Sequence, residues 1–319
     1  MVLASINCFF TCRNLLVIME VGEPKRASGY GEPPWRFRGR ALYQLHLVKA
    51  ETARSFIPKE FRLVEAFGYT LGGFFLASYE DSPAGPFDEL VVIAGIMWNP
   101  PTSCAWAARV LVSSDDACNH GRKHVGLPSQ VAKFSKRVTA IPRQEGSTFN
   151  GFLNMIGLGG TLSSADDCAD VRVTELNGPS VTDICDINLK SVGLKSNKWM
   201  GPSVKMSLPS FSGGTKYIPN FLRYSCHIEC RVRTVRPVKV SGLPLESKDG
   251  VQETFSHQNC LPAESTRDEL DNGLIRSISV MLSKPLLAFE FTSLKMRVEA
   301  PVVLTHVCKN TLGTSSQLS

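Results

Sequence analysis

A carboxylate set among apolar residues is the first candidate for chemistry. Residues 82–95 read Ser-Pro-Ala-Gly-Pro-Phe-Asp-Glu-Leu-Val-Val-Ile-Ala-Gly, and the Pro-Ala-Gly-Pro run predicts a tight turn that leads into a strand. Alternate residues of a strand share a face, so Glu89 lies between Phe87 and Val91. Burial there raises the pKa of a carboxyl group unless a cation pairs with it. Glu89 is a candidate acid or base, although structural ion pairs give the same signature.

A basic cluster between two glycines and a proline is the second candidate. Residues 121–133 read Gly-Arg-Lys-His-Val-Gly-Leu-Pro-Ser-Gln-Val-Ala-Lys, which predicts a constrained loop before a strand. Arg122 could pair with a carboxylate, and His124 could transfer a proton near neutral pH. The alternative for both residues is a solvated loop, and for His124 alone this alternative is favoured.

The ten cysteines have no regular spacing, which favours reduced thiols in a core over a disulfide framework. The tightest pair is Cys226 and Cys230. On a strand both sulfur atoms share one face but lie about 13 Å apart, too far for one zinc ion. We therefore expect no metal site and no cofactor.

Composition excludes several classes of protein. Hydrophobic residues make up 43% and charged residues 20%, as in ordinary globular proteins. The net charge of +6 is spread along the chain, without the dense basic stripe of a nucleic-acid-binding protein. No run approaches the roughly 20 apolar residues of a membrane helix, so no integral membrane segment is expected. Residues 1–18 fit either a weak transit peptide or a region upstream of a second start at Met19, so a plastid and a cytoplasmic location both stay open.

Short apolar runs separated by turn residues predict a mostly antiparallel β-sheet that closes on itself, without long amphipathic helices. We expect an N-terminal extension (1–28), one β-rich domain (29–307) with a surface excursion at about 242–270, and a flexible tail (308–319). A short helix is expected at 50–56. The expected strands are 41–48, 61–69, 74–79, 90–98, 106–112, 137–141, 171–176, 181–189, 204–208, 221–240, 286–294 and 295–304.

Both candidate segments resemble motifs of the acetoacetate decarboxylase-like family. The first is similar to its Ser-Pro-x-Gly-Pro-aromatic-x-Glu stretch, and the second to its Gly-Arg-Glu-x-x-Gly-x-Pro-Lys-Lys-x-Ala loop. The resemblance implies an α+β fold: a cone-shaped, mostly antiparallel β-barrel with a few short helices, an apolar pocket and a tendency to form homo-oligomers. The family's two lysine positions are occupied here by Ser129 and Gln130, so no amine is available there to form an imine. The resemblance therefore does not extend to Schiff-base decarboxylation.

Longer strings resemble the plant neoxanthin-deficient family, among them Gly-Tyr-Gly-Glu-Pro-Pro-Trp at 29–35 and Trp-Asn-Pro-Pro-Thr-Ser-Cys-Ala-Trp at 98–106. This resemblance implies a role in making neoxanthin from violaxanthin, with a xanthophyll or another apolar small molecule as ligand. One hypothesis is a binding or accessory protein that acts with a protein partner in carotenoid synthesis. The other is a cofactor-independent isomerase in which Glu89 is the acid or base and Arg122 or His124 stabilises the developing charge.

Overall fold

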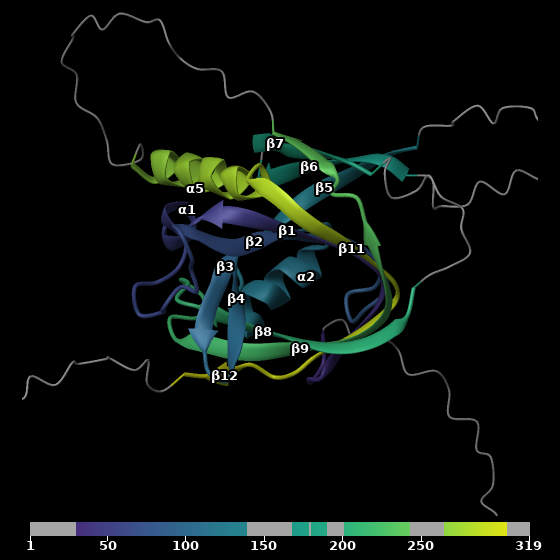
Figure 1. Ribbon diagram of the computed structural model, residues 1–319, viewed down its shortest axis with the longest axis horizontal. Helices are drawn as coiled ribbons and strands as arrows, with labels where there is room; N and C mark the ends of the chain where they lie inside the picture. Colours follow the sequence, from purple (N-terminus) through teal and green to yellow (C-terminus); the bar gives the residue numbers. More distant parts are fainter. Residues whose placement is uncertain (1–29, 139–167, 179, 190–200, 243–264, 305–319) are drawn as a thin grey trace, which may run out of the picture.

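The computed structural model describes residues 30–138, 168–178, 180–189, 201–242 and 265–304. The expected N-terminal extension, residues 243–264 of the expected excursion at 242–270 and the expected tail lie outside the described residues, whereas residues 265–270 of the excursion are helical. The described residues form a β-barrel with a second, smaller sheet and three helices beside it (Figure 1).

Seven strands close the barrel, because each pairs with the next and the last pairs with the first. All of these pairs are antiparallel except β4 with β8, which run parallel and meet at Ala105–Ser210 and Trp106–Phe211. In order around the barrel the strands are β1 (Trp35–Lys49), β2 (Tyr69–Asp81), β3 (Phe87–Asn99), β4 (Thr102–Val112), β8 (Ser203–Gly213), β9 (Phe221–Val235) and β11 (Lys284–Val298). The predicted mostly antiparallel barrel is confirmed.

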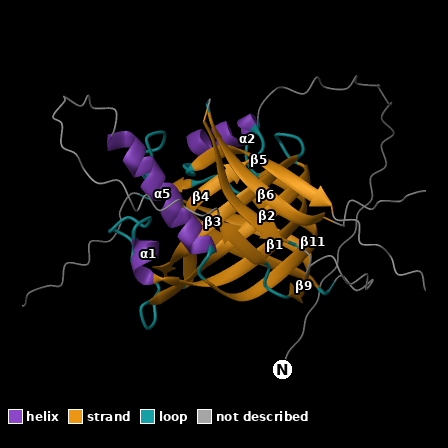
Figure 2. Cartoon of the chain, turned by 90° about the horizontal axis from the view of Figure 1, so that it is seen from above, coloured by secondary structure: helices purple, strands orange, loops and turns teal. Residues whose placement is uncertain are grey.

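The second sheet extends from β4 through β5 (Ser129–Val138), β6 (Cys168–Asn177), β7 (Ser180–Asn188) and β10 (Lys239–Gly242), and the two-residue strand β12 (Val302–Val303) pairs with β9. The helices are α1 (Ala50–Arg54), α2 (Asp115–His120) and α5 (Ser265–Met281). A single π-helical turn, η1 (Gly121–Val125), continues α2. Figure 2 shows α5 lying across the strands, with α1 near one of its ends.

The alternation of side chains along the barrel strands creates two cores. In β2, Phe75, Ala77 and Tyr79 point into the barrel, whereas Phe74 and Leu76 point out. The outward set packs against the second sheet and against the C-terminal end of α5, where Val280 and Met281 are buried. The barrel interior therefore holds one apolar core, and the space between the barrel wall, the second sheet and α5 holds the other.

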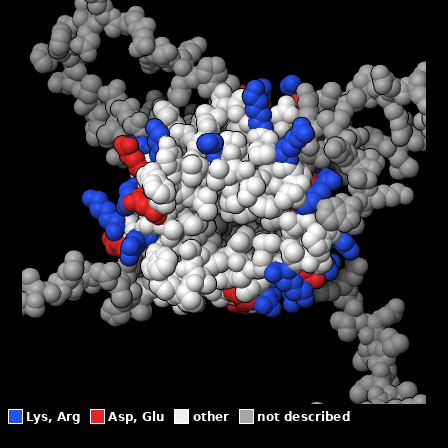
Figure 3. All heavy atoms as spheres, viewed as in Figure 1, with Lys and Arg blue, Asp and Glu red and all other residues white. Residues whose placement is uncertain are grey.

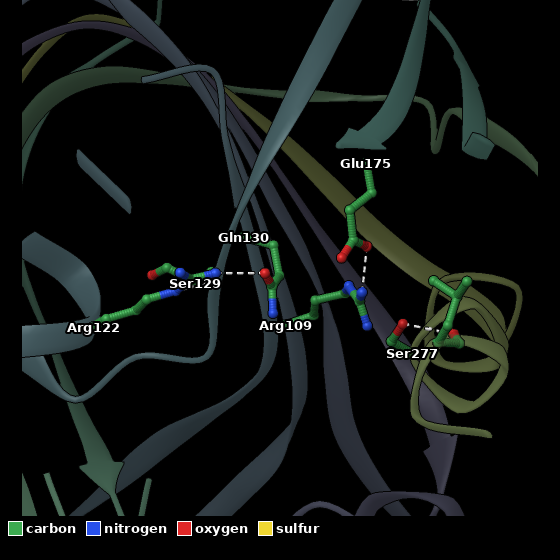
Figure 4. A network of polar contacts seen from close by, with 7 residues as sticks. Arg109, Arg122, Ser129, Gln130, Glu175 and Ser277 are labelled. Carbon is green, nitrogen blue, oxygen red and sulfur yellow. Dashed lines mark hydrogen bonds and ion pairs between the residues drawn. The ribbon is translucent and has the colours of Figure 1, made fainter. Parts of the chain in front are cut away.

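A buried ion pair ties the second sheet to the barrel. The guanidinium group of Arg109 on β4 donates to the carboxylate of Glu175 on β6, and the Glu175 side chain is only 1% exposed (Figure 4). Beside them in Figure 4, the hydroxyl group of Ser277 donates to the carbonyl oxygen of Leu274 within α5. Breaking a buried pair by removing one partner leaves an uncompensated charge, so Arg109 and Glu175 hold the two sheets in one arrangement.

Several details of the expected elements are wrong, among them the strand expected at 221–240, which the structure divides into β9 and β10. Residues 61–69 are not a strand: they cross the end of β3, where the amide of Val64 donates to the carbonyl oxygen of Ile96 and the amide of Trp98 donates to the carbonyl oxygen of Arg62. Residues 286–304 contain one long strand, because β11 continues through a bulge at Ser293, whose φ is 51°. The loop expected from 121 is helical to Val125, and β5 begins at Ser129 rather than at 137.

A further difference is α5, a 17-residue helix where no long helix was expected. Its sequence, Ser-Thr-Arg-Asp-Glu-Leu-Asp-Asn-Gly-Leu-Ile-Arg-Ser-Ile-Ser-Val-Met, has most of its apolar residues in the second half. The apolar periodicity of the whole segment is therefore weak, and the helix is stabilised by tertiary packing of its C-terminal end.

Candidate functional site

A cavity of about 250 Å³ lies inside the barrel. Aromatic and aliphatic side chains make up most of its wall, and they come from all seven barrel strands, from α2 and from the segment before β1. The ribbon in Figure 1 is seen looking into the barrel, and Figure 3 shows from the same side that the surface is hollowed near its centre and that the atoms around the hollow are uncharged. The cavity therefore suits an apolar ligand.

Glu89 projects into this cavity from β3, together with Phe87, Val91 and Ile93, as the alternation of the strand predicts. Burial of its carboxyl group raises the pKa from an ordinary value of 4.5 to about 7. The hydroxyl group of Tyr79 donates a 2.8 Å hydrogen bond to Oε2 of Glu89, which lowers the pKa but does not cancel the effect of burial. With this pKa, both the protonated and the ionised form of the carboxyl group are populated at neutral pH.

A second polar group lies on the wall near one end of the cavity. The His120 ring, at the end of α2, stacks on the Tyr30 ring with centroids 3.7 Å apart and meets the edge of the Trp35 ring at 4.3 Å. Burial, and then the nearby His124, lower the His120 pKa to about 4, so the ring is neutral at pH 7. Its buried Nε2 has no hydrogen-bond partner among the described residues, and His120 lines the cavity. This nitrogen can therefore make a hydrogen bond to a ligand.

Arg122 and His124 do not line the cavity with Glu89. Arg122 Nε donates to the carbonyl oxygen of Ser129 (2.7 Å), and a terminal nitrogen of Arg122 donates to Oε1 of Gln130 (2.5 Å), as Figure 4 shows. Arg122 thus ties η1 to the start of β5. The His124 ring is exposed and reaches the cavity only indirectly, through its stacking on His120 with centroids 4.9 Å apart.

Ser129 and Gln130 occupy opposite faces of β5. Ser129 is 2% exposed and lines the cavity, whereas Gln130 accepts its hydrogen bond from Arg122 outside it. A side chain at Gly121 would place its Cβ only 2.4 Å from Oγ of Ser129, so a larger residue here would displace this hydroxyl group. Among the described residues on the cavity wall there is a hydroxyl at position 129 and no lysine.

The sequence did not single out several groups around Glu89. Tyr79, Tyr30, His120 and Tyr224 lie on the cavity wall, and so does Cys226, which the sequence indicated only as a core thiol. Burial raises the pKa of the Cys226 thiol to about 12 and the pKa of the Tyr224 phenol above its ordinary range, with Glu89 adding to both. Only Tyr79 had a local signal: it precedes the turn at residues 82–86, and in the β2–β3 pair it lies opposite Phe87, two residues from Glu89.

The five cysteines that the structure describes as free include Cys226 and Cys230, and both belong to the barrel core, as their spacing predicted. No group of three or more His, Cys, Asp or Glu residues within the described ranges is arranged to hold a metal ion. No helix among the described residues is long and apolar enough to cross a membrane.

The chain is similar in structure to some solved proteins and similar in sequence to others. Solved structures with a similar course of the chain include an acetoacetate decarboxylase from Legionella pneumophila (TM-score 0.49, 12% identity, 90% of this chain and 93% of that one). Another is the enduracididine biosynthesis enzyme MppR with HEPES buffer bound (TM-score 0.46, 12% identity, 89% and 91%). A scan against models of protein families matches none of them.

Curated plant proteins are far more similar. The chain is 61% identical over 286 residues to Protein NEOXANTHIN-DEFICIENT 1 of Arabidopsis thaliana, covering 90% of this chain and 99% of that protein. It is 60% identical to the protein of the same name from Solanum lycopersicum (92% and 100%) and 51% identical to that from Oryza sativa subsp. japonica (92% and 97%). The chain therefore belongs to the neoxanthin-deficient 1 family of plant proteins.

Proposed function

We propose that this chain binds an epoxy xanthophyll by one end group inside the barrel and in this way supports the formation of neoxanthin from violaxanthin. The observation that carries the proposal is the apolar cavity with Glu89 on its wall. The names of the plant relatives point to the same product. Binding without decarboxylation is the function that this cavity supports best.

The size of the cavity limits how much of the ligand enters. At about 250 Å³ it lies just below the roughly 300–1,000 Å³ range of pockets that enclose a drug-sized molecule. A substituted cyclohexane ring matches this volume, whereas a whole xanthophyll with its long polyene chain does not. The end group therefore lies inside the barrel and the polyene chain passes out of it.

The polar groups on the wall suit an oxygenated end group. A protonated Glu89 donates a hydrogen bond to an epoxide or hydroxyl oxygen, and the neutral His120 ring offers Nε2 on another part of the wall. A site with few polar groups in an apolar wall orients a ligand by those groups. Ser129 stands where the resembling decarboxylase motif has its lysine, so imine formation lacks its nucleophile.

The test measures the binding of violaxanthin and its conversion in the same sample. Purified full-length chain is incubated with violaxanthin in detergent, and the pigments bound to the protein and free in solution are identified by chromatography. The proposal expects stoichiometric binding with violaxanthin recovered unchanged. Absence of binding by the wild-type protein, with the fold verified by circular dichroism, contradicts it.

A second candidate function, isomerisation of the epoxide, is favoured by the pKa of about 7 at Glu89. In this reaction the carboxylate removes the proton from the alkene carbon that is bonded to the epoxide, the C–H electrons form a second double bond from this carbon to the epoxide carbon to give the allene, and the C–O bond at that epoxide carbon breaks. The oxygen then takes a proton, so substrate and product are isomers and no redox cofactor is needed. Tyr79, which donates to the carboxylate, holds Glu89 in place for such a transfer.

Conversion of violaxanthin by the purified protein alone decides for the isomerase. In that case Glu89→Gln abolishes turnover but retains binding, because glutamine has the shape of the acid and cannot accept the proton. Equal turnover by wild type and variant removes Glu89 from the mechanism.

A further inference from the structure

Five exposed apolar residues lie at one end of the barrel, and we call them the apolar rim. The exposed fraction is 100% for Phe67, 55% for Trp98 and 51% for Leu287, and it is somewhat below 40% for the other two, Tyr69 and Leu71. Scattered apolar residues on a surface are normal, but a group of large ones at the same place marks an interaction site.

The strand register places three rim residues together. Tyr69 and Leu71 on β2 lie in the row that continues to Phe75 and Tyr79 inside the barrel, and β2 has no register shift against β1 over this stretch. Leu71 pairs with Leu47 of β1, and two residues earlier on β1 Leu45 pairs with Leu287 of β11. The rim is therefore the end of the same apolar surface that forms the cavity wall.

Trp98 connects the rim to the cavity itself. Its partner across the β3–β4 pair is Ser103, which lines the cavity, and Ile96 lines it two residues earlier on β3. Ile96 and Ser103 are half-buried, as are Glu89 and Val91 farther along β3, whereas Trp98 is exposed. Trp98 therefore continues the row of cavity-lining side chains to the surface.

Phe67 is the rim residue that is hardest to explain by folding alone. Its side chain is fully exposed, and its φ of 53° lies in the left-handed region that disfavours residues with a bulky side chain. Asparagine or glycine would suit this turn better in water. The phenylalanine side chain is stabilised here when an apolar phase covers it.

Exposed cations flank the rim. Lys49 is the strand partner of Tyr69, Lys284 is the strand partner of Leu47, and the carbonyl oxygen of Arg62 accepts the backbone hydrogen bond of Trp98. Aromatic and aliphatic side chains next to Lys and Arg are the combination that binds the boundary between the acyl chains and the headgroups of an anionic bilayer.

We propose that the apolar rim docks on the surface of a lipid bilayer, with Phe67 and Trp98 entering the headgroup boundary. The ligand then passes between bilayer and cavity without crossing water. The docking surface stands on the rim alone; only the identity of what passes through it depends on the proposed function.

The test is flotation of the full-length protein, without any pigment, with vesicles of phosphatidylcholine or of phosphatidylcholine mixed with phosphatidylglycerol. The wild-type protein is expected to float with the mixed vesicles. The double variant Phe67→Asn/Trp98→Gln is expected to lose about tenfold or more in partition coefficient. The fold should survive, because both side chains are exposed and asparagine tolerates the left-handed conformation at position 67.

A matched control changes two exposed valines elsewhere, Val181→Thr and Val302→Thr, whose exposed fractions are 65% and 58%. Flotation of the control like the wild type supports the proposal. Three outcomes overturn it: no flotation of the wild type, equal flotation of wild type and rim variant, or a rim that instead joins two copies of the chain, seen as a dimer that the rim variant makes monomeric. Because no xanthophyll is present, a failure here is separate from a failure of xanthophyll binding in detergent.

Discussion

The hydroxyl group of Tyr79 donates a 2.8 Å hydrogen bond to Oε2 of Glu89 inside the barrel, and the two residues come from neighbouring strands. This contact opposes the effect of burial on the carboxyl group, since a hydrogen bond to the charged form favours ionisation. The effect of burial is the larger of the two, and the Glu89 pKa is therefore about 7, above its ordinary value of 4.5.

Glu89 makes the stability of the protein depend on pH. Its pKa is about 7 in the folded state and 4.5 ordinarily, so between these values the folded state binds more protons than the unfolded state. The free energy of unfolding therefore falls as pH rises from about 4.5 to about 7, by roughly 3 kcal/mol at most, and this loss stays constant at higher pH. Urea unfolding at a series of pH values checks the slope. Glu89→Gln should flatten this part of the curve, and an unchanged slope in the variant would contradict the assignment.

Tyr79→Phe should raise the Glu89 pKa further. The variant removes the hydrogen bond that favours the carboxylate, and a hydrogen bond to a charged group contributes roughly 1.5–3 kcal/mol, or about one to two pH units. NMR titration of the labelled Glu89 side-chain carbon measures the shift. Tyr43→Phe is the control, because Tyr43 also lines the cavity but makes no described hydrogen bond to Glu89. Equal shifts in the two variants would mean that cavity polarity, rather than the contact, sets the pKa.

His124 influences the cavity through His120. Burial is the largest cause of the lowered His120 pKa, and the charge of His124 is the second. His124→Ala should therefore raise the His120 pKa from about 4 while leaving it below its ordinary value of 6.5. Two-dimensional NMR of the imidazole nitrogens follows the titration. A His120 pKa that does not move in the variant would show that the two rings do not interact in solution.

Local patterns predicted the parts of this protein that depend on neighbours in sequence. Alternation along one strand placed Glu89 on the inner face and predicted the direction of its pKa shift. It could not show that Tyr30 and His120 stack on one wall, because those residues meet only after the barrel closes and α2 packs beside it. The same limit applies to Arg122: its residue type suggested a charge partner for the site, whereas tertiary packing turns it toward the backbone of Ser129.

The fold shows the same division. The turn residues between apolar runs predicted most strands, since each turn is a local event. Closure of the barrel by the parallel β4–β8 pair and the placement of α5 depend on contacts between distant segments, and neither has a signal in a short stretch of sequence. The residues around Ser293 carry no local sign that β11 continues through a bulge there, so the sequence predicts two strands where the structure has one.

The close approach of Gly121 to Ser129 is a final test of how the cavity wall is built. Gly121→Ala should lower the free energy of unfolding by about 1–3 kcal/mol, because the added Cβ would lie 2.4 Å from Oγ of Ser129 and would force the wall to shift. Ser129→Ala in the same chain should recover most of this loss, since the next nearest atom, Cβ of Ser129, is 3.4 Å from the new methyl group. Ser129→Ala alone supplies the baseline for the double-mutant cycle in urea. Additive losses would mean that the two side chains are not in contact, whereas a rescue would show that the hydroxyl group of Ser129 packs against position 121 of η1.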